Sequence, residues 1–441
     1  MTILPLTRAT TRLAGAMTIG LLLAGVGCNS VLEANDPDIV TQATSAAGAV
    51  ALRNGVILRF NQAMDGSGDA PDGFFLLGGL MGDEWVSGDS FEQRNTTDWR
   101  TTIYTNSFLS DIFRRAGRVR NEGQAAIIAL RQFSPTPASN IGQMFALIAF
   151  AENQVSEFFC NGIPFSELDG NQIVFGDPVS YDSGFARAVN HADSALVFVA
   201  GPDSARIRQF ATVIKARALL NRNQPAAAAA LAATVATSFT YLSTHSVNST
   251  DNVLWLQSIS LRRYVMADNE GTNGLNFRSA NDPRIPIGPL VNAFDNSVQN
   301  VATQAIWTKR TDSVVVASGI EARLIEAEAA LRAGNNALFL QKLNDARATK
   351  AALTPLADPG TQTARENLLF RERAFWMFST GHRLGDLRRL IRQYGRTADQ
   401  VFPIGISSKG TPYGSDVNFP IPQSEQNNPK DPTAQCTDRL P

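Results

Sequence analysis

The chain has 441 residues, with 39 Lys and Arg against 40 Asp and Glu, so its formal net charge is −1 at pH 7. Because it is nearly neutral, it has no electrostatic reason to bind nucleic acid or an anionic membrane surface. After the N-terminus no apolar run reaches the roughly 18 residues of a membrane-spanning helix. The length instead predicts a large folded core or two sub-domains.

The N-terminus is predicted to be a processing signal rather than part of the fold. Arg8 and Arg12 lead into an apolar run that ends at Cys28. This run is too short to cross roughly 30 Å of hydrocarbon, and small residues before a cysteine are typical of a lipoprotein cleavage site. We therefore expect a lipoprotein signal peptide at 1–27, a lipid on Cys28 and a tether at 28–40. The alternative is an ordinary signal peptide with an incidental cysteine.

Two other cysteines, Cys160 and Cys436, are left in the mature chain. In an exported protein they can form a disulfide, which would tie the C-terminal tail to the end of an interior helix. The alternative is two unpaired thiols. Neither cysteine has histidine or cysteine neighbours at metal-ligand spacing, so no metal site is expected.

Helical periodicity dominates the mature chain. In 205–220 apolar residues recur at i, i+3, i+4 and i+7, and a polar connection of about four residues leads to an alanine-rich second helix at 225–237. The same layout recurs at 318–349, where Gly334 is a favourable C-terminal cap. Two such hairpins resemble tetratricopeptide-type units, which bury their open faces by stacking on one another.

The other elements are less regular. Further helices are predicted at 40–63, 102–132, 141–160 and 364–392, short strands at 253–257 and 313–317, a turn-rich loop at 171–180, and irregular stretches at 64–100, 242–312 and 400–441. Loops of this length are uncommon in a compact domain unless they bind something or form a small sub-domain. We therefore predict an all-α, tetratricopeptide-like helical-repeat superhelix, right-handed and rigid, with large irregular loop insertions gathered on one face.

Motifs of enzymes are not found in the sequence. His191, His245 and His382 lie in unrelated settings, and there is neither a Gly-x-Ser-x-Gly elbow nor a phosphate-cradling loop. Adjacent acids such as Asp83 and Glu84 do not make a glycosidase pair, which needs carboxylates about 5–9 Å apart across a substrate. We predict no enzymatic activity and no cofactor. A hydrolase with a triad or convergent carboxylates assembled in a cleft is the alternative.

Charged and aromatic residues share the segment 371–389, whose sequence is RERAFWMFSTGHRLGDLRR. Three parts of it, Glu372-Arg373, Gly381-His382-Arg383 and Asp386-Leu387-Arg388-Arg389, fit the order Glu-Arg, hydrophobic pair, Glu-Gly-x-Arg, Asp-Leu-x-Arg. The segment therefore resembles the C-terminal signature of the SusD/RagB family.

Four other segments resemble motifs of the same family, in the family's order. They are an aromatic Gly-x-Pro turn at 158–165, Asp-Pro-Arg within 281–284, an Arg-Leu-x-Glu helix at 323–329 with its Asn-x-x-Arg partner at 344–347, and a closing Pro-Ile-Pro segment at 419–429. The resemblance implies one SusD-like domain at 41–441. It also implies an outer-membrane lipoprotein that faces the cell surface and captures nutrients for a TonB-dependent, SusC-like transporter. Because the sequence holds no other long apolar run, membrane contact is expected through the lipid alone.

The 371–389 segment is expected to have a structural role rather than to bind a ligand. Arg383 and Asp386 lie three residues apart on a predicted helix and can pair side by side. Glu372 and Arg373 can satisfy loop carbonyls and amides. Loss of one partner of a buried pair costs roughly 3–5 kcal/mol, so we predict that these four residues hold the scaffold together.

Ligand contact is expected from aromatic and acidic residues in two of the irregular stretches. Sugar rings present apolar C–H faces that stack on aromatics, and their hydroxyls need amide or carboxylate partners. The candidates are Asp83, Glu84, Trp85, Trp99 and Tyr104 in the polar loop at 82–104, which also holds Phe91, and Trp255 and Tyr264 in the insertion at 242–312, which also holds Trp307. The alternative is that these aromatics anchor a small core.

The nature of the ligand stays open at this point. Six Tyr and five Trp against 25 Phe is a thin supply of sugar-stacking rings with polar edges, so peptides fit as well as glycans, although the resemblance favours glycans. A second class of function is a helical-repeat scaffold of the cell envelope that binds no nutrient. A transporter gene beside this one would favour the first class.

Overall fold

Helices that pack one after another make up most of the protein in the computed structural model, which describes residues 43–68, 70–169, 172–431 and 435–441. These residues belong to one compact unit. The predicted signal peptide, Cys28 and the tether lie outside the described residues. Across the described part of the chain, no helix is both long enough and apolar enough to span a membrane.

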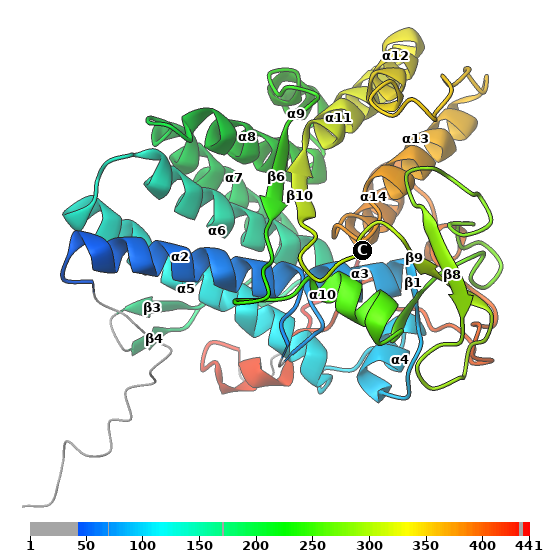
Figure 1. Ribbon diagram of the computed structural model, residues 1–441, viewed down its shortest axis with the longest axis horizontal. Coiled ribbons are helices and arrows are strands. Elements are labelled where there is room, and N and C mark those ends of the chain that lie inside the picture. The colour runs from blue at the N-terminus through cyan, green and yellow to red at the C-terminus, as the bar shows by residue number, and fades with distance from the viewer. Residues whose placement is uncertain (1–42, 69, 170–171, 432–434) are drawn as a thin grey trace, which may run out of the picture. The chain divides into compact units, whose positions relative to one another are not determined.

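The first half of the chain stacks four long helices in order. They are α2 (Ala46–Met64), α5 (Ser107–Phe133), α6 (Ser139–Phe158) and α7 (Tyr181–Val197), and each packs against the next (Figure 1). Side-chain oxygens of Ser45, Asn106 and Ser180 accept hydrogen bonds from backbone N–H groups at the starts of α2, α5 and α7. The helices at 40–63, 102–132 and 141–160 are therefore confirmed, whereas α7 was not predicted.

The two predicted hairpins are confirmed. The first consists of α8 (Ser204–Asn221) and α9 (Pro225–Ala232), and the second of α11 (Gly319–Arg332) and α12 (Asn336–Arg347). Helix α9 packs against both α8 and α11, so the second hairpin continues the stack of the first although 86 residues separate them. The stack as a whole is all-α and tetratricopeptide-like, as predicted.

The single helix predicted at 364–392 is divided in two. Helix α13 (Gln362–Trp376) ends before a tight turn, and α14 (Arg383–Tyr394) follows it. Within the turn Ser379 has φ 52° and Gly381 has φ 75°, both in the left-handed region, so helical hydrogen bonding stops there.

The stretch at 64–100 is not irregular, which corrects the prediction. It contains α3 (Phe74–Gly82) and α4 (Glu92–Asp98). Every residue of α3 is buried, so its sequence, FFLLGGLMG, is apolar on all sides and has no helical periodicity to detect. Helix α4 is short and polar and lies in a run of turn-forming residues.

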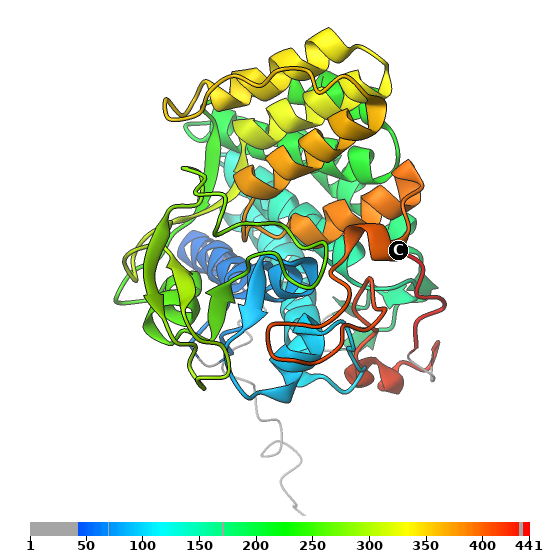
Figure 2. The ribbon, with the colours of Figure 1, turned by 90° about the vertical axis from the view of Figure 1, so that its right-hand side faces the viewer.

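The strands pair into small antiparallel ribbons. The pairs are β1 (Trp85–Ser87) with β7 (Tyr264–Met266), β2 (Ile163–Pro164) with β5 (Pro178–Val179), β3 (Glu167–Asp169) with β4 (Gln172–Val174), β6 (Thr240–Ser243) with β10 (Val314–Ser318), and β8 (Ile287–Val291) with β9 (Val301–Gln304). The strand at 313–317 is confirmed as β10. The prediction of a strand at 253–257 is wrong, because these residues form α10 (Val253–Trp255) and the start of a π-helical turn, η1 (Leu256–Ser260). Figure 2 shows α4, β1, β7, β8 and β9 gathered beside the helical stack.

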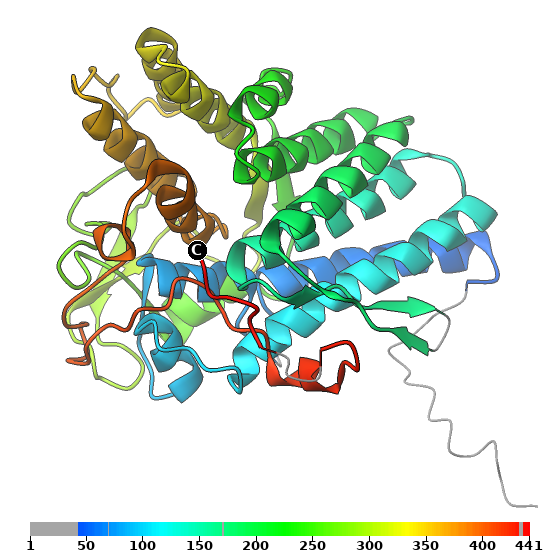
Figure 3. The same ribbon diagram turned by 180° about the vertical axis from the view of Figure 1, so that it is seen from behind.

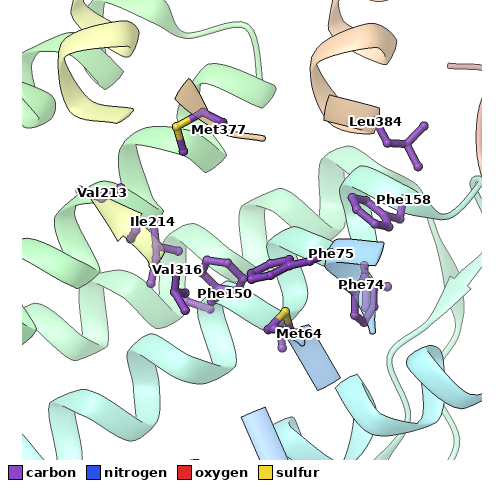
Figure 4. Close-up of a cluster of buried hydrophobic side chains, with 14 of the residues drawn as sticks. Met64, Phe74, Phe75, Phe150, Phe158, Val213, Ile214, Val316, Met377 and Leu384 are labelled. Carbon is purple, nitrogen blue, oxygen red and sulfur yellow. The ribbon is translucent and has the colours of Figure 1, made fainter. Parts of the chain in front are cut away.

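The core joins the helical stack to the C-terminal helices through α3. Figure 4 shows Phe74 and Phe75 of α3 between side chains of α2, α6 and α14. The ring of Phe74 lies 5.3 Å from that of Phe158 at the end of α6. Helix α3 is thus the interior element that fixes the loop following it, residues 82–104.

The C-terminal tail is attached covalently to the end of α6. Cys160 and Cys436 form a disulfide with an S–S distance of 2.08 Å and a Cα–Cα distance of 5.6 Å. Around it the N–H of Cys160 donates to the carbonyl of Phe419 at 2.9 Å, and the N–H of Thr437 donates to the carbonyl of Asn161 at 2.9 Å. The tail at 435–441 is therefore attached both by the disulfide and by backbone hydrogen bonds.

Candidate functional site

The residues of the 371–389 segment that were expected to be structural are buried and ion-paired. Arg373 donates to both carboxylate oxygens of Asp386, at 2.7 and 2.9 Å, and Arg389 donates to it at 2.8 Å. Burial by itself raises the pKa of Asp386, but the two guanidinium charges outweigh it and hold that pKa well below its usual value. Arg383 does not pair with Asp386, which corrects the prediction; it pairs with Asp83 at 2.7 and 3.0 Å.

Glu372 holds together three segments that are far apart in the sequence. Its carboxylate accepts from Arg284 at 2.7 and 3.1 Å and from Arg347 at 2.9 Å, not from loop amides as predicted. Arg284 closes the Asp-Pro-Arg motif and Arg347 closes the Asn-x-x-Arg motif. Three of the segments that carry the family resemblance therefore meet in one buried ion cluster.

Asp83, Glu84 and Trp85 lie in the interior instead of on a ligand face. Trp85 is 0% exposed and donates from Nε1 to the hydroxyl of Ser379 at 2.9 Å. One oxygen of Glu84 accepts from the N–H of Ser379 at 3.0 Å, and burial raises the pKa of Glu84 to about 8. These side chains connect the loop after α3 to the turn between α13 and α14.

The remaining predicted aromatics differ in how far a ligand could reach them. Tyr264 is 0% exposed, and its hydroxyl donates to Asp72. Trp99 and Trp255 are half-buried, at the end of α4 and in α10. Tyr104 is 45% exposed. The prediction of direct ligand contact is therefore wrong for Asp83, Glu84, Trp85 and Tyr264, because these side chains are buried. Tyr104 is accessible to a ligand.

Tyr104 lies at the rim of a pocket of about 530 Å³. The pocket lies between the start of α5 and a 3-10 turn, η2 (Gln423–Asn427), in the C-terminal segment that Figure 3 shows in red. Its lining is Tyr104, Thr105, Ser107, Ser110, Asp111, Gln423, Ser424, Gln426 and Asn427. Of the predicted ligand residues, only Tyr104 belongs to it.

Hydrogen bonds join the two walls of this pocket. The N–H of Gln423 donates to the carbonyl of Tyr104 at 2.9 Å, and the hydroxyl of Ser110 donates to that of Ser424 at 3.3 Å. On the helix side, the side chain of Asn106 accepts from the N–H of Phe108 at 3.0 Å and so starts α5 at a defined residue. The pocket therefore depends on two segments from opposite ends of the chain.

The lining offers hydrogen bonds in both directions and little charge. Side-chain amides both donate and accept, hydroxyls do either, and the ring of Tyr104 supplies an apolar face. The carboxylate of Asp111 is paired with Arg114 at 2.7 Å. Neither lysine nor arginine is among the described residues that line the pocket. Such a surface suits an uncharged, hydroxyl-rich ligand better than an anion.

The amide wall of the pocket was missed from the sequence. Gln423, Gln426 and Asn427 belong to the irregular stretch at 400–441, which is polar, but the aromatic content of 82–104 and 242–312 drew the prediction there. The available signal was the amide-rich run after Pro422. Nothing in the sequence indicates that this run meets Tyr104.

A Ser-His-Asp cluster is present, but it lacks the arrangement of a hydrolytic triad. Ser243, His245 and Asp65 are all buried, and the serine hydroxyl donates to the carboxylate of Asp65. The distance from that hydroxyl to Nε2 of His245 is 3.4 Å. In a triad the histidine lies between serine and acid and the serine faces a substrate. This cluster therefore gives no support to the hydrolase alternative.

Comparisons with known proteins identify the fold. No model of a known protein family matches the sequence, and no curated protein matches it. Among solved structures, the protein is similar to a putative sugar binding protein from Bacteroides vulgatus (15% identity, TM-score 0.64, covering 90% of this chain and 99% of that one). It is also similar to a SusD superfamily protein from Parabacteroides distasonis (14%, 0.65, 88% and 98%) and to surface glycan-binding protein A from Bacteroides uniformis (13%, 0.62, 88% and 99%).

These neighbours cover nearly the whole of both chains, so the protein has a SusD-like fold. The resemblance that was drawn from five short motifs is confirmed at the level of the fold. The buried ion cluster around Glu372 explains why short motifs can indicate the fold. Its residues, Arg284, Arg347 and Glu372, come from three of these motifs and connect separate helices and loops.

Proposed function

We propose that the protein is a non-enzymatic, lipid-anchored binding protein of the outer membrane. It captures oligosaccharides at the cell surface and delivers them to a TonB-dependent, SusC-like transporter. Two of the similar structures are described as sugar- or glycan-binding proteins, which supports a glycan ligand over a peptide. The pocket at Tyr104 is the observation that carries the proposal.

The pocket has the chemistry that an uncharged sugar requires. The half-exposed ring of Tyr104 can stack on the C–H face of one sugar unit, while side-chain amides of Gln423 and Asn427 serve its hydroxyls. Its volume of about 530 Å³ is within the range of small-molecule sites. Its open rim allows a longer chain to extend beyond the bound unit.

A glycan and peptide array followed by calorimetry tests this assignment. With the best neutral glycan, Tyr104→Ala should lower affinity about tenfold, since loss of a stacked ring costs on the order of 1–2 kcal/mol. Gln423→Ala should lower affinity by about three- to tenfold through the loss of one or two hydrogen bonds.

The matched control is Gln341→Ala, because Gln341 is exposed on α12 and should leave binding unchanged. Trp85→Ala is unsuitable as a binding test, because loss of this buried ring should destabilise the fold. The pocket assignment is wrong if Tyr104→Ala and Gln423→Ala both bind every retained glycan as wild type does. If the protein retains peptides but no glycans on the array, its ligand is a peptide rather than a glycan.

The anchor and the transporter are proposed from the N-terminal sequence and from the family resemblance. In membrane fractions of the native host, the wild-type protein should be lipidated at Cys28 and co-purify with a transporter. Cys28→Ala should release it from the outer membrane without changing binding by the purified protein. Co-purification with envelope proteins but no glycan or peptide binding would favour the scaffold alternative.

A further inference from the structure

Two exposed phenylalanine rings flank one guanidinium group at the edge of the β-ribbons. Phe91 and Phe294 are each 45% exposed. The guanidinium carbon of Arg263 lies 5.3 Å from the centre of the Phe91 ring and 4.4 Å from that of Phe294. A cation beside two exposed apolar rings is an amphipathic surface, and we call these three residues with Arg262 the arginine patch.

Backbone hydrogen bonds fix the three segments of the patch to one another. Gly88 N–H donates to the carbonyl of Arg263 at 2.8 Å, and Phe294 N–H donates to that of Arg262 at 3.0 Å. A Cβ on Gly88 would lie 2.5 Å from the carbonyl oxygen of Arg262, so glycine is required for this approach. The patch is therefore built by the fold rather than by a chance meeting of surface side chains.

Arg262 has donors to spare. Among the described residues, the guanidinium of Arg262 forms neither a hydrogen bond nor an ion pair, and its backbone has a φ of 56°. Nη1 of Arg263 forms an ion pair with the carboxylate of Asp89 at 3.6 Å, and its Nε is buried without a partner.

Two of the nearby carboxylates, those of Asp89 and Asp295, are already engaged. Asp89 accepts from Arg94, which also binds Asp72 at 2.7 and 2.8 Å. Asp295, next to Phe294, faces Lys409 at 3.5 Å. Among the described residues Arg262 has no carboxylate partner, so its guanidinium is the unpaired cation of the patch.

We propose that the arginine patch binds an acidic substituent of a saccharide, a carboxylate as found in uronic acids. The rings of Phe91 and Phe294 take the C–H faces of the sugar, and Arg262 with Arg263 bind the carboxylate, for which the guanidinium fork is well matched. The inference rests on the proposed glycan-binding function and adds an acidic ligand class to it.

The patch adjoins the neutral pocket through the first turn of α5. The ring of Phe91 lies 6.1 Å from that of Phe108, and Phe108 follows Ser107, which lines the pocket. One site thus suits uncharged units and its neighbour suits acidic ones. A polymer that carries acids on some of its units would match both.

The size of the patch favours a saccharide over a folded protein. Two phenylalanine rings at 45% exposure present on the order of 100 Å² each, whereas a stable protein interface needs roughly 800 Å² from each partner. A sugar with one carboxylate requires no more than the patch provides.

The test compares a polyuronate with its uncharged methyl ester, using the full mature protein. Polygalacturonate, alginate and hyaluronan are the acidic probes, and methyl-esterified polygalacturonate is the matched neutral one. Wild type should bind at least one acidic polymer about tenfold more tightly than the neutral ester, and 500 mM NaCl should abolish this preference. Arg262→Gln and Arg263→Gln should each remove most of it, whereas Arg262→Lys should retain part.

The control is Arg310→Gln, since Arg310 is in the same insertion but pairs with Asp251 at 2.8 and 2.9 Å. Binding of the neutral pocket ligand should be unchanged in all arginine variants, which also shows that they fold. The inference is overturned if no acidic polymer is preferred, or if the glutamine variants keep the preference. Neutral binding that depends on Tyr104 would then still support the proposed function, and preferential capture of envelope proteins by wild type over Arg262→Gln would point to a protein partner instead.

Discussion

Buried carboxylates in this protein fall into two groups according to their partners. Asp386 and Glu372 each accept hydrogen bonds from two guanidinium groups. Glu84 is as deeply buried, but one of its oxygens accepts only a backbone N–H and the other has no partner. The pKa of Glu84 is accordingly raised, chiefly by burial and only partly offset by that N–H and by Arg383.

Glu84 should therefore make stability depend on pH. Its pKa rises from 4.5 to about 8 on folding, so its contribution is complete below pH 4.5 and is lost as pH rises to about 8. In urea unfolding, wild type should lose on the order of 3 kcal/mol more than Glu84→Gln between pH 5 and pH 8, because a glutamine does not ionise. The expectation fails if the two proteins respond to pH in parallel.

At the scale of single residues, charge was easier to interpret from the sequence than aromaticity. Glu372 and Arg373 were expected to be structural because they can satisfy loop carbonyls and amides, but their actual partners, Arg284, Arg347 and Asp386, could not be named. Trp85 and Tyr104 looked alike as loop aromatics, yet one is buried and the other open. What separates them is contact with Ser379 and Gln423, which are distant in the sequence.

At the scale of elements, the turn between α13 and α14 is a tightly constrained connection. Gly381 has φ 75°, and its carbonyl accepts from Gln154 at 2.9 Å and from Arg217 at 2.8 Å. A Cβ on Gly381 would lie 2.7 Å from a ring carbon of Phe75 in α3. The turn thus packs tightly against α3, before the loop that leads toward the ligand face.

Gly381 and Gly334 provide a matched pair of substitutions. Gly334 has nearly the same φ, 74°, but a Cβ there would meet nothing within 4 Å. Gly334→Ala should cost about 1 kcal/mol from the backbone alone, and Gly381→Ala about 2–5 kcal/mol, since steric overlap is added. Chemical denaturation measures both, and equal losses would mean that α3 moves aside without cost.

Helices were predictable from the sequence where a long segment has helical spacing of apolar residues, and not where a short run is uniformly apolar. Helix α8 was found from its apolar residues at helical spacing, whereas α3 is apolar all round and α10 is a three-residue apolar run that is equally compatible with a strand. Stacking of α9 on α11 followed from the repeat-like hairpins. The ribbons at 264–304 could not be anticipated, because their pairing depends on contacts between separate loops.

At the scale of the whole molecule, the C-terminal segment connects the ligand face to the helical stack. Its η2 turn lines the pocket with Gln423, and its tail is bound to the end of α6 by Cys436. Asn418 further holds the tail by donating to the carbonyls of Arg439 and Leu440 at 3.1 and 2.9 Å. The positions of the η2 turn and of the tail therefore both depend on contacts with the rest of the fold.

The disulfide should consequently support both stability and ligand binding. Cys160 and Cys436 are 276 residues apart, so the bond removes much freedom from the unfolded chain, and the Cys160→Ser/Cys436→Ser double variant should lose about 2–4 kcal/mol in urea unfolding. Affinity for the neutral pocket ligand should fall several-fold in the same variant, because the wall that carries Gln423 loses an anchor. Binding at the arginine patch, which is built from 88–91, 262–263 and 294, should change less. Equal loss at both sites would show that the bond stabilises the whole molecule without any particular effect on the pocket.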